Sequence, residues 1–472
     1  MSTRVGSKIF VDRIVIEGFK SIRRVELALE PGINLLVGPN ASGKTNILEA
    51  IYFLYRALVE ELHRAPYMPH TPFYWSPVDL VYGRNPLNPI LFTLDMTYYN
   101  VREGTKHSIS FTVEFRVSPD QLTLLPSRIE IDYGRDTLIA VSHEGMEVKI
   151  REELFEAVKS ALSAEESRRI QNEFRREENY LVYRQDLSSA GETHSMLRLL
   201  RIFLAPPVVS RFAIKSNNVV VSFADILPLT KLRIPIVFRL QRIASGETPK
   251  GFELRWITDM AFMWEIRELL SRIMLLKHPD IGSLREPKML TSTERLDVRA
   301  SNLAPVLLVL MSRYGTLPPR ISEALTKLFP GMKIKFATQY GRVAIEVEED
   351  GLELPPANVA DGLFKLLAIL TAIELEPSIL LIDELENSMH AQLIEYVVDE
   401  LNNLEIPVIV ATHSPIVVDL VGPERTYVVE KKPGEGTVVT KIEQPEELAK
   451  KLDELGIAFS DYIFYKRTRV AG

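Results

Sequence analysis

The stretch Gly38-Pro39-Asn40-Ala41-Ser42-Gly43-Lys44-Thr45 decides the predicted fold of this 472-residue chain. It has the spacing G-x-x-x-x-G-K-[ST], and it follows an apolar run, Ile33–Val37, that predicts a buried strand. A helical pattern begins after Thr45 and continues to about Arg64. Glycines let such a loop bend until successive N–H groups face inward, and the next helix points its partly positive N-terminus at the same place. The stretch therefore predicts a site for the phosphates of a nucleoside triphosphate.

The residue types in this stretch divide the expected roles. Lys44 is expected to reach the β- and γ-phosphates of ATP, and the Thr45 hydroxyl to hold Mg²⁺. The nucleotide contacts expected here are Gly38, Asn40, Ala41, Ser42, Gly43, Lys44, Thr45 and the following Asn46. The alternative is a chance glycine loop before a core helix, and the complete motif in a strand–loop–helix context argues against it.

A second apolar run, Ile379–Ile382, ends in two carboxylates, Asp383 and Glu384. Such a run predicts a buried parallel strand, and ligands bind at the carboxyl ends of strands in open α/β sheets. Asp383 is predicted to hold Mg²⁺ and Glu384 to act as the general base on the attacking water. The alternative is a helix N-terminus that collects acids for its dipole. His413 follows the next apolar strand, Pro407–Ala411, so it is expected at the same edge, in contact with the γ-phosphate.

Alternating and helical spacings of apolar residues predict the other elements. Strands are expected as a pair within 9–29 and at Ile90–Tyr98, Ser108–Val117, Lys333–Ala337, Val343–Val347, Thr426–Glu430 and Thr437–Ile442. Helices are expected within 151–183 and at Ile257–Leu276, Asn302–Arg313, Ile321–Leu328, from Asn358–Gly362 onward, His390–Leu404 and Pro445–Leu455. The proline-rich segment 66–89 predicts an irregular connection.

The composition narrows the class of protein. The chain has no cysteine, which excludes disulfides and thiolate chemistry and fits an intracellular protein. It has no apolar run of about 18 residues, and its first residues are polar, so neither a membrane span nor a signal peptide is expected and the cytoplasm is the expected location. Few glutamines and many prolines hint at a thermophile.

The segment 198–242 is the most basic part of a chain whose net charge is −7. It holds 8 Lys and Arg and a single acid, Asp225, and its pattern predicts a hairpin over Val208–Lys215 and Val219–Ile226. Clustered cations with interleaved aromatics suit contact with DNA. They equally suit a solvated sheet face whose arginines pair with acids elsewhere in the chain, such as Glu346, Glu348, Glu349 and Asp350.

Taken together, the motifs resemble those of the ABC-type ATPase heads of the RecF/SMC-like group, in particular the stand-alone and OLD-type ATPases of prokaryotes. The resembling segments are 16–22, 34–46, Ala360-Asp361-Gly362, 381–387 with His390, and Thr412-His413-Ser414-Pro415. The resemblance implies an α/β P-loop NTPase with a mixed core sheet, an antiparallel N-terminal β region and a large α+β insertion. It places the N-terminal lobe at 1–100, the insertion at 101–294 and the C-terminal lobe at 295–472.

The resemblance also implies that two heads form a homodimer around two ATP molecules. Each phosphate loop would face the partner's signature segment, expected at 358–363, with Asp361 and Gly362 in contact with the nucleotide. Ala360 stands where that segment normally has serine, so slow or partner-driven hydrolysis is expected. Gln392 does not lie where the family's coupling loop has its glutamine. The segment after His413 is too short for the nuclease domain of OLD-type enzymes, so any cleavage would need another chain.

Two functional hypotheses remain open. The first is an ATPase switch whose ATP-driven dimerisation acts on DNA, in repair, chromosome maintenance or defence against mobile elements. The second is an ATP-gated sensor that docks a separate effector protein, a nuclease or toxin, without binding DNA. The ATP subunit of a membrane transporter is disfavoured by the large insertion and the SMC-like start of the chain.

Overall fold

The computed structural model describes residues 8–60, 76–100, 104–118, 124–134, 136–142, 145–151, 174–177, 180–186 and 265–466. They belong to two compact units: unit 1 combines Met1–Ala28 with Phe53–Ser271, and unit 2 combines Leu29–Tyr52 with Arg272–Gly472. The predicted basic segment 198–242 with its hairpin lies outside the described residues. Within the described ranges, no helix is long and apolar enough to cross a membrane.

Unit 1 contains an antiparallel sheet with the strand order β2-β1-β4-β5-β6-β7-β8-β10-β9. Its strands are β1 (Lys8–Phe19), β2 (Ile22–Ala28), β4 (Ile90–Asn100), β5 (Thr105–Val117), β6 (Leu124–Tyr133), β7 (Asp136–Ser142), β8 (Gly145–Arg151), β9 (Phe174–Glu177) and β10 (Tyr180–Asp186). Alternate residues of β5 are buried, which is the period of a sheet with one covered face. Phe53, Phe92 and Phe115 pack there with ring centroids 5.1–6.1 Å apart.

One sequence-based expectation for this unit is wrong in part. Residues 174–177 and 180–183, expected to be helical, lie in strands β9 and β10, and β10 pairs with β8 from Tyr180–Arg151 to Asp186–Gly145. The backbone ladder with β8 overrides a local helical spacing. The other residues of that expected helical region, 152–173, lie outside the described part. The helix expected from Thr45 to about Arg64 is α1 (Lys44–Tyr55) followed by a π-helix over Arg56–Glu60, and residues 61–64 lie outside the described part of the chain.

Unit 2 is built on a sheet with the strand order β11-β16-β17-β3-β18-β19. The strands are β3 (Gly32–Val37), β11 (Ile273–Leu276), β16 (Ile379–Asp383), β17 (Pro407–Thr412), β18 (Thr426–Lys432) and β19 (Gly436–Lys441). All neighbours are parallel except β18 and β19, which are antiparallel. Every residue of β3 and β17 is buried, as expected for parallel strands covered on both faces.

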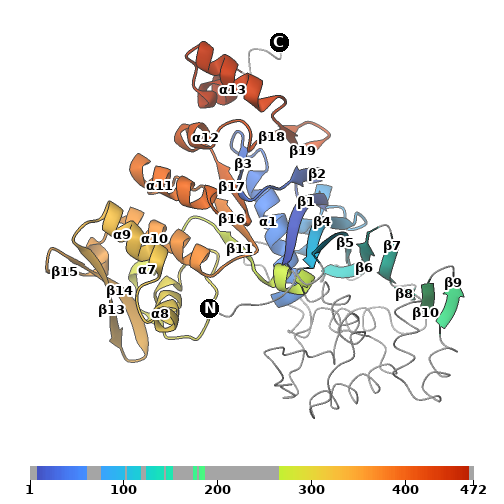
Figure 1. The fold of residues 1–472 in the computed structure, drawn as a ribbon, viewed down its shortest axis with the longest axis horizontal. Helices are drawn as coiled ribbons and strands as arrows, with labels where there is room; N and C mark the ends of the chain where they lie inside the picture. Colours follow the sequence, from blue (N-terminus) through green and yellow to red (C-terminus); the bar gives the residue numbers. More distant parts are fainter. Residues whose placement is uncertain are drawn as a thin grey trace. The chain divides into compact units, whose positions relative to one another are not determined.

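Helices surround this sheet, and the most buried of them is α10 (Asp361–Glu374), in which every residue from Leu363 onward is buried. It contacts α8, α9 and α11 (Figure 1). The other helices are α7 (Ile281–Arg285), α8 (Leu303–Tyr314), α9 (Pro319–Leu328), α11 (Ala391–Asn402), α12 (Pro415–Val421), α13 (Pro445–Glu454) and α14 (Phe459–Asp461). A small antiparallel sheet joins β12 (Lys288–Met289), β13 (Met332–Gln339), β14 (Arg342–Glu349) and β15 (Leu352–Leu354).

One correction to the predicted elements bears on the site. The helix expected over 257–276 is described only from residue 265 to residue 271, and Ile273–Leu276 is instead strand β11, parallel to β16. A run of four apolar residues has too little length for its period to separate strand from helix. The correction adds a strand end beside Asp383.

Candidate functional site

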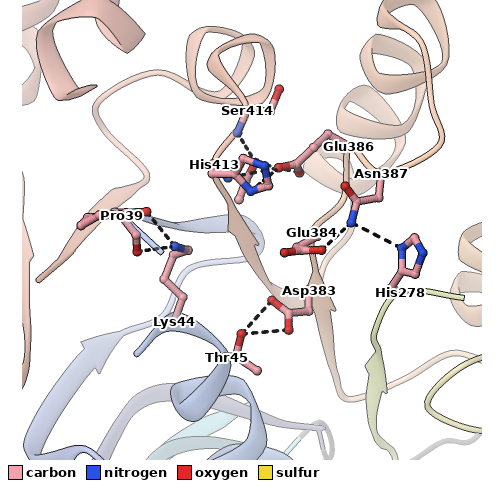
Figure 2. Close-up of polar contacts among 12 residues, drawn as sticks. Pro39, Lys44, Thr45, His278, Asp383, Glu384, Glu386, Asn387, His413 and Ser414 are labelled. Carbon is pink, nitrogen blue, oxygen red and sulfur yellow. Dashed lines mark hydrogen bonds and ion pairs between the residues drawn. The ribbon is translucent and has the colours of Figure 1, made fainter. Parts of the chain in front are cut away.

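Four parallel strands of unit 2, β11, β16, β17 and β3, end at one edge of the sheet. The register places Val37 beside Thr412 and Asp383 beside Ala411. Thr45 and Asp383, which are 338 positions apart in the chain, therefore approach each other, as Figure 2 shows. The segments that meet at this edge are the loop 38–45, Asp383-Glu384, Thr412-His413 and Lys277-His278.

The loop 38–45 is held in a narrow space by the β18–β19 hairpin. A Cβ atom on Gly38 would lie 2.0 Å from the Val429 carbonyl oxygen, and one on Gly43 would lie 2.1 Å from Thr437 Oγ1. Gly43 also has a φ of 110°, which side-chain-bearing residues rarely adopt. Thr437 Oγ1 in turn donates a hydrogen bond of 3.0 Å to the Ser42 carbonyl. Neither position has room for a side chain, because Gly38 faces a backbone carbonyl and Gly43 faces the Thr437 side chain.

Within this loop, the polar groups are arranged to receive a ligand. Ser42 is buried, and its Oγ has no hydrogen-bond partner among the described residues. Asn40 and Ala41 are exposed, Ala41 has the left-handed φ of 63°, and Asn46 lies half-buried in the first turn of α1. A buried hydroxyl without a partner is costly. The loop thus fits an anion that would supply the missing acceptor.

Lys44 folds back over this loop. Its Nζ donates hydrogen bonds to the carbonyl oxygens of Gly38, at 2.7 Å, and Pro39, at 3.1 Å (Figure 2). Burial lowers the pKa of Lys44, and the carboxylates of Asp383, Glu384 and Glu386 oppose that shift. The ammonium is therefore partly dehydrated and lies where a phosphate oxygen could replace the loop carbonyls as its acceptor.

Thr45 and Asp383 are in direct contact. Thr45 Oγ1 lies 3.0 Å from Asp383 Oδ2 and 3.3 Å from Oδ1. A hydroxyl and a carboxylate are the protein ligands that Mg²⁺ takes when phosphate oxygens and water complete its shell. The described residues contain no group of three or more His, Cys, Asp or Glu that could hold a metal by themselves. The donor set therefore fits Mg²⁺ delivered with a nucleotide.

A buried ion pair supports this contact from the neighbouring strand. Lys277, at the end of β11, pairs with Glu49, which lies one turn after Thr45 in α1, and their side chains are 15% and 9% exposed. Burial raises the pKa of Asp383, whereas the Thr45 hydrogen bond and the Lys277 charge oppose the rise. Asp383 is therefore a carboxylate that would gain from a nearby cation.

Glu384 has an uncommon backbone conformation, with a φ of 56°. Its N–H donates to the Ala411 carbonyl at 2.9 Å, and its own carbonyl accepts from Lys365 Nζ at 2.8 Å. Its carboxylate accepts from Asn387 Nδ2, which also lies 3.4 Å from His278 Nδ1. The Glu384 side chain is thus held in place beside Asp383 (Figure 2).

His413 lies at the end of β17, where Glu386 holds it. The Glu386 carboxylate accepts hydrogen bonds from Thr412 Oγ1 at 2.8 Å and from the His413 N–H at 3.1 Å, and it lies 3.2 Å from His413 Nδ1. This contact puts a proton on Nδ1 and leaves Nε2 as the ring nitrogen that faces away from Glu386. The imidazole is half-exposed, with 49% of its side chain accessible, so it can meet a ligand.

The signature-like residues lie at the start of α10. Ala360 is exposed and makes no side-chain cap, and Asp361 accepts a hydrogen bond of 2.7 Å from Arg285. A Cβ atom on Gly362 would lie 3.0 Å from the Ser388 carbonyl, so this helix start packs tightly against the segment that follows Glu384. The first N–H groups of α10 follow the exposed Ala360 and have no partners within the helix.

A cavity of about 600 Å³ opens beside Asp383, the last residue of β16, and Glu384, which follows it. One water occupies roughly 30 Å³, so the cavity has ample room for a water molecule next to Glu384. Its lining residues are Lys277, His278, Pro279, Asp280, Ile281, Arg299, Asp361, Asp383, Glu384 and Ser388.

Sequence reasoning did not identify several residues that shape the site. Thr437 and Lys277 reach it from strands whose contacts are long-range, and Lys365 is a buried cation within an apolar helix. Glu386 alone had a visible signal, since it is an acid three positions after Asp383 in the same acidic segment. The other three could be found only from the fold.

Comparison with known proteins gives two family matches. Residues 10–65 match the family described as "RecF/RecN/SMC N terminal domain". Residues 253–419 match the family described as "AAA domain, putative AbiEii toxin, Type IV TA system", so this similarity begins upstream of residue 295, where the C-terminal lobe was expected to start.

The chain is also similar to individual proteins over short or distant matches. It is 52% identical over 44 residues to the DNA replication and repair protein RecF of Vibrio vulnificus and 60% identical over 42 residues to that of Erwinia tasmaniensis. Each match covers 9% of this chain and 12% of the relative. The chain also resembles a crystal structure of the Smc head domain with an extended coiled coil, bound to the C-terminal domain of ScpA and derived from Pyrococcus furiosus. The TM-score is 0.41 at 14% identity, over 95% of this chain and 99% of that one.

The parallel sheet and the glycine loop with its lysine and threonine define a P-loop NTPase of α/β fold, as the sequence predicted. Together with the two family matches, these features support an ABC-type ATPase head of the RecF/SMC-like group.

Proposed function

We propose that unit 2 binds ATP with Mg²⁺ and hydrolyses it. The observation that carries this proposal is the contact of 3.0 Å between Thr45, in the phosphate loop, and Asp383, at the end of β16. The loop N–H groups, Ser42 and Lys44 would bind the phosphates, and Thr45 and Asp383 would hold Mg²⁺. When bound, Mg²⁺ neutralises charge on the phosphate oxygens.

Two further residues have roles in the proposed reaction. The Glu384 carboxylate is fixed beside the cavity and accepts the proton of the attacking water. His413 presents Nε2 to the γ-phosphate while Glu386 holds the opposite ring nitrogen. These roles predict that His413→Ala reduces turnover more than it reduces ATP binding.

ATP binding would join two heads into a homodimer. The exposed start of α10, with Asp361 and Gly362, would face the nucleotide on the partner and offer it backbone donors in place of the absent serine at position 360. Light scattering tests this directly: the mass should double with a non-hydrolysable ATP analogue in the wild type and stay monomeric in Lys44→Ala. A wild-type mass that ignores the analogue would contradict the dimer.

We further propose that the dimer acts on DNA inside the cytoplasm. The similarity to RecF, whose name states a role in DNA replication and repair, supports this, and so does the charge of segment 198–242. Residues 1–100 and 295–472 would form the head and an accessory domain would lie within 101–294, ending before residues 272–294, which belong to unit 2. Reversing the charges of Arg211, Lys215, Arg233 and Arg239 should weaken DNA binding and flatten its salt dependence. An unchanged affinity and salt slope would contradict this assignment.

The second candidate is an ATP-gated sensor that docks a separate effector protein. The match of 253–419 to the family described as "AAA domain, putative AbiEii toxin, Type IV TA system" favours it. The two candidates differ in a pull-down with the ATP-locked protein: retention of a nuclease or toxin after nuclease digestion of all nucleic acid supports the sensor. Loss of every partner under that digestion supports the DNA-bound switch.

A further inference from the structure

Lys365 is a buried cation that the proposed reaction does not use. It lies in α10, one turn after Asp361, and only 2% of its surface is exposed. Lysine ammonium groups are rarely buried, because dehydration of the charge is costly. A methionine of similar length would fill the same volume without that cost. The position of the ammonium therefore calls for a specific contact.

That contact is with the main chain of Glu384. Lys365 Nζ donates a hydrogen bond of 2.8 Å to the Glu384 carbonyl, while the Glu384 N–H is bonded to Ala411. Both main-chain polar groups of Glu384 are thus held by hydrogen bonds, and the residue has the left-handed conformation, with a φ of 56°. Because the backbone angle sets the direction of the side chain, these two bonds also set where the carboxylate lies.

We infer that Lys365 is a positioning residue, which holds the Glu384 peptide so that its carboxylate meets the attacking water and ties that carboxylate to the start of α10. This inference rests on the proposed hydrolytic role of Glu384. Lys365 is only 4 positions from Asp361, so a helix start displaced by a partner's nucleotide would carry the ammonium with it. The link lets the partner-facing end of α10 control the base.

The tests compare ATP turnover in Lys365→Met and Lys365→Arg with that in Thr371→Val. Thr371 is fully buried in the same helix, its Oγ1 has no hydrogen-bond partner among the described residues, and valine has nearly its shape. Lys365→Met should lower kcat at least tenfold with the KM for ATP within twofold of the wild type, and Lys365→Arg should restore most of kcat. Thr371→Val should keep the wild-type kcat. A wild-type kcat in Lys365→Met overturns the inference.

A double-mutant cycle with Glu384→Gln separates positioning from general packing. If Lys365 acts through Glu384, adding Lys365→Met to Glu384→Gln should change the residual rate by less than twofold. A multiplicative loss in the double variant would show that Lys365 acts elsewhere and overturns the inference. Failure of the proposed function looks different: Glu384→Gln alone would then hydrolyse ATP at the wild-type rate.

Discussion

Replacing Lys365 by methionine should change how the stability of the protein depends on pH. Burial lowers the pKa of Lys365 from its ordinary 10.5 to about 8, against the opposing charges of Glu386, Glu384 and Asp383. Below pH 8 the lysine is charged in both the folded and the unfolded state, and its dehydration costs on the order of 3 kcal/mol of folding free energy. Between that pH and 10.5 only the unfolded state keeps the proton, so wild-type stability rises relative to the methionine variant.

The net effect at pH 7 is the difference between two terms. Methionine removes the dehydration cost, but it leaves the Glu384 carbonyl without the Lys365 hydrogen bond, a loss of about 1–3 kcal/mol. Lys365→Met should therefore be as stable as the wild type or up to about 2 kcal/mol more stable at pH 7. A variant that is equally stable yet slower is the behaviour expected when a residue is retained for position.

Urea unfolding followed by circular dichroism, without nucleotide, measures both terms. The free energy of unfolding of the wild type minus that of Lys365→Met should increase by more than about 2 kcal/mol between pH 7 and pH 10. Lys450, exposed on α13, provides the control, because Lys450→Met should run parallel to the wild type over this range. If the unfolding free energies of Lys365→Met and the wild type changed in parallel with pH, the claim that the Lys365 ammonium is dehydrated would be refuted.

Three other variants test separate parts of the site. Gly43→Ala places a Cβ atom 2.1 Å from Thr437 Oγ1 at a φ of 110°, so ATP affinity in calorimetry should fall at least tenfold; an unchanged affinity would contradict the loop geometry. Asp383→Asn should abolish Mg²⁺-dependent turnover. In EDTA at pH 7, however, its melting temperature should be no lower than that of the wild type. The reason is that burial raises the pKa of Asp383, so the ionised carboxylate costs folding free energy that an amide does not. A lower melting temperature in EDTA would count against that burial cost. Glu386→Gln keeps an acceptor for Thr412 but loses the charge beside His413, so kcat should drop about tenfold, whereas Glu395→Gln, exposed on α11, should keep it; equal rates in both variants would remove Glu386 from the site.

The parts of the fold that were predicted from sequence are those with strong local patterns. The strands Ile33–Val37, Ile379–Ile382 and Pro407–Ala411 were evident because runs of that length that are apolar, except for Asn34, are typical of buried parallel strands. Once they are parallel neighbours, the residues after each strand must share one edge. That rule alone predicts that the phosphate loop, the two acids and His413 lie together.

The parts that escaped prediction depend on contacts between distant segments. β11 is four apolar residues long, and only its pairing with β16 makes it a strand. In the sequence, Lys365 is a single polar residue within an apolar helix. Its hydrogen-bond partner is a main-chain carbonyl 19 positions away, and no side-chain type in the sequence indicates such a partner. The hydrogen bond from Thr437 to the Ser42 carbonyl joins residues 395 positions apart. Side-chain contacts of this kind depend on the tertiary structure and cannot be predicted from the sequence alone.

The most direct test of the central claim measures ATP binding and ATP turnover together in the wild type and in Glu384→Gln. If Lys44, Asp383 and Glu384 act on one bound ATP, Glu384→Gln should bind ATP with Mg²⁺ as tightly as the wild type, lose at least 99% of turnover, a factor of about 100, and accumulate as an ATP-bound dimer. Wild-type turnover in Glu384→Gln, with ATP binding intact, would contradict the account.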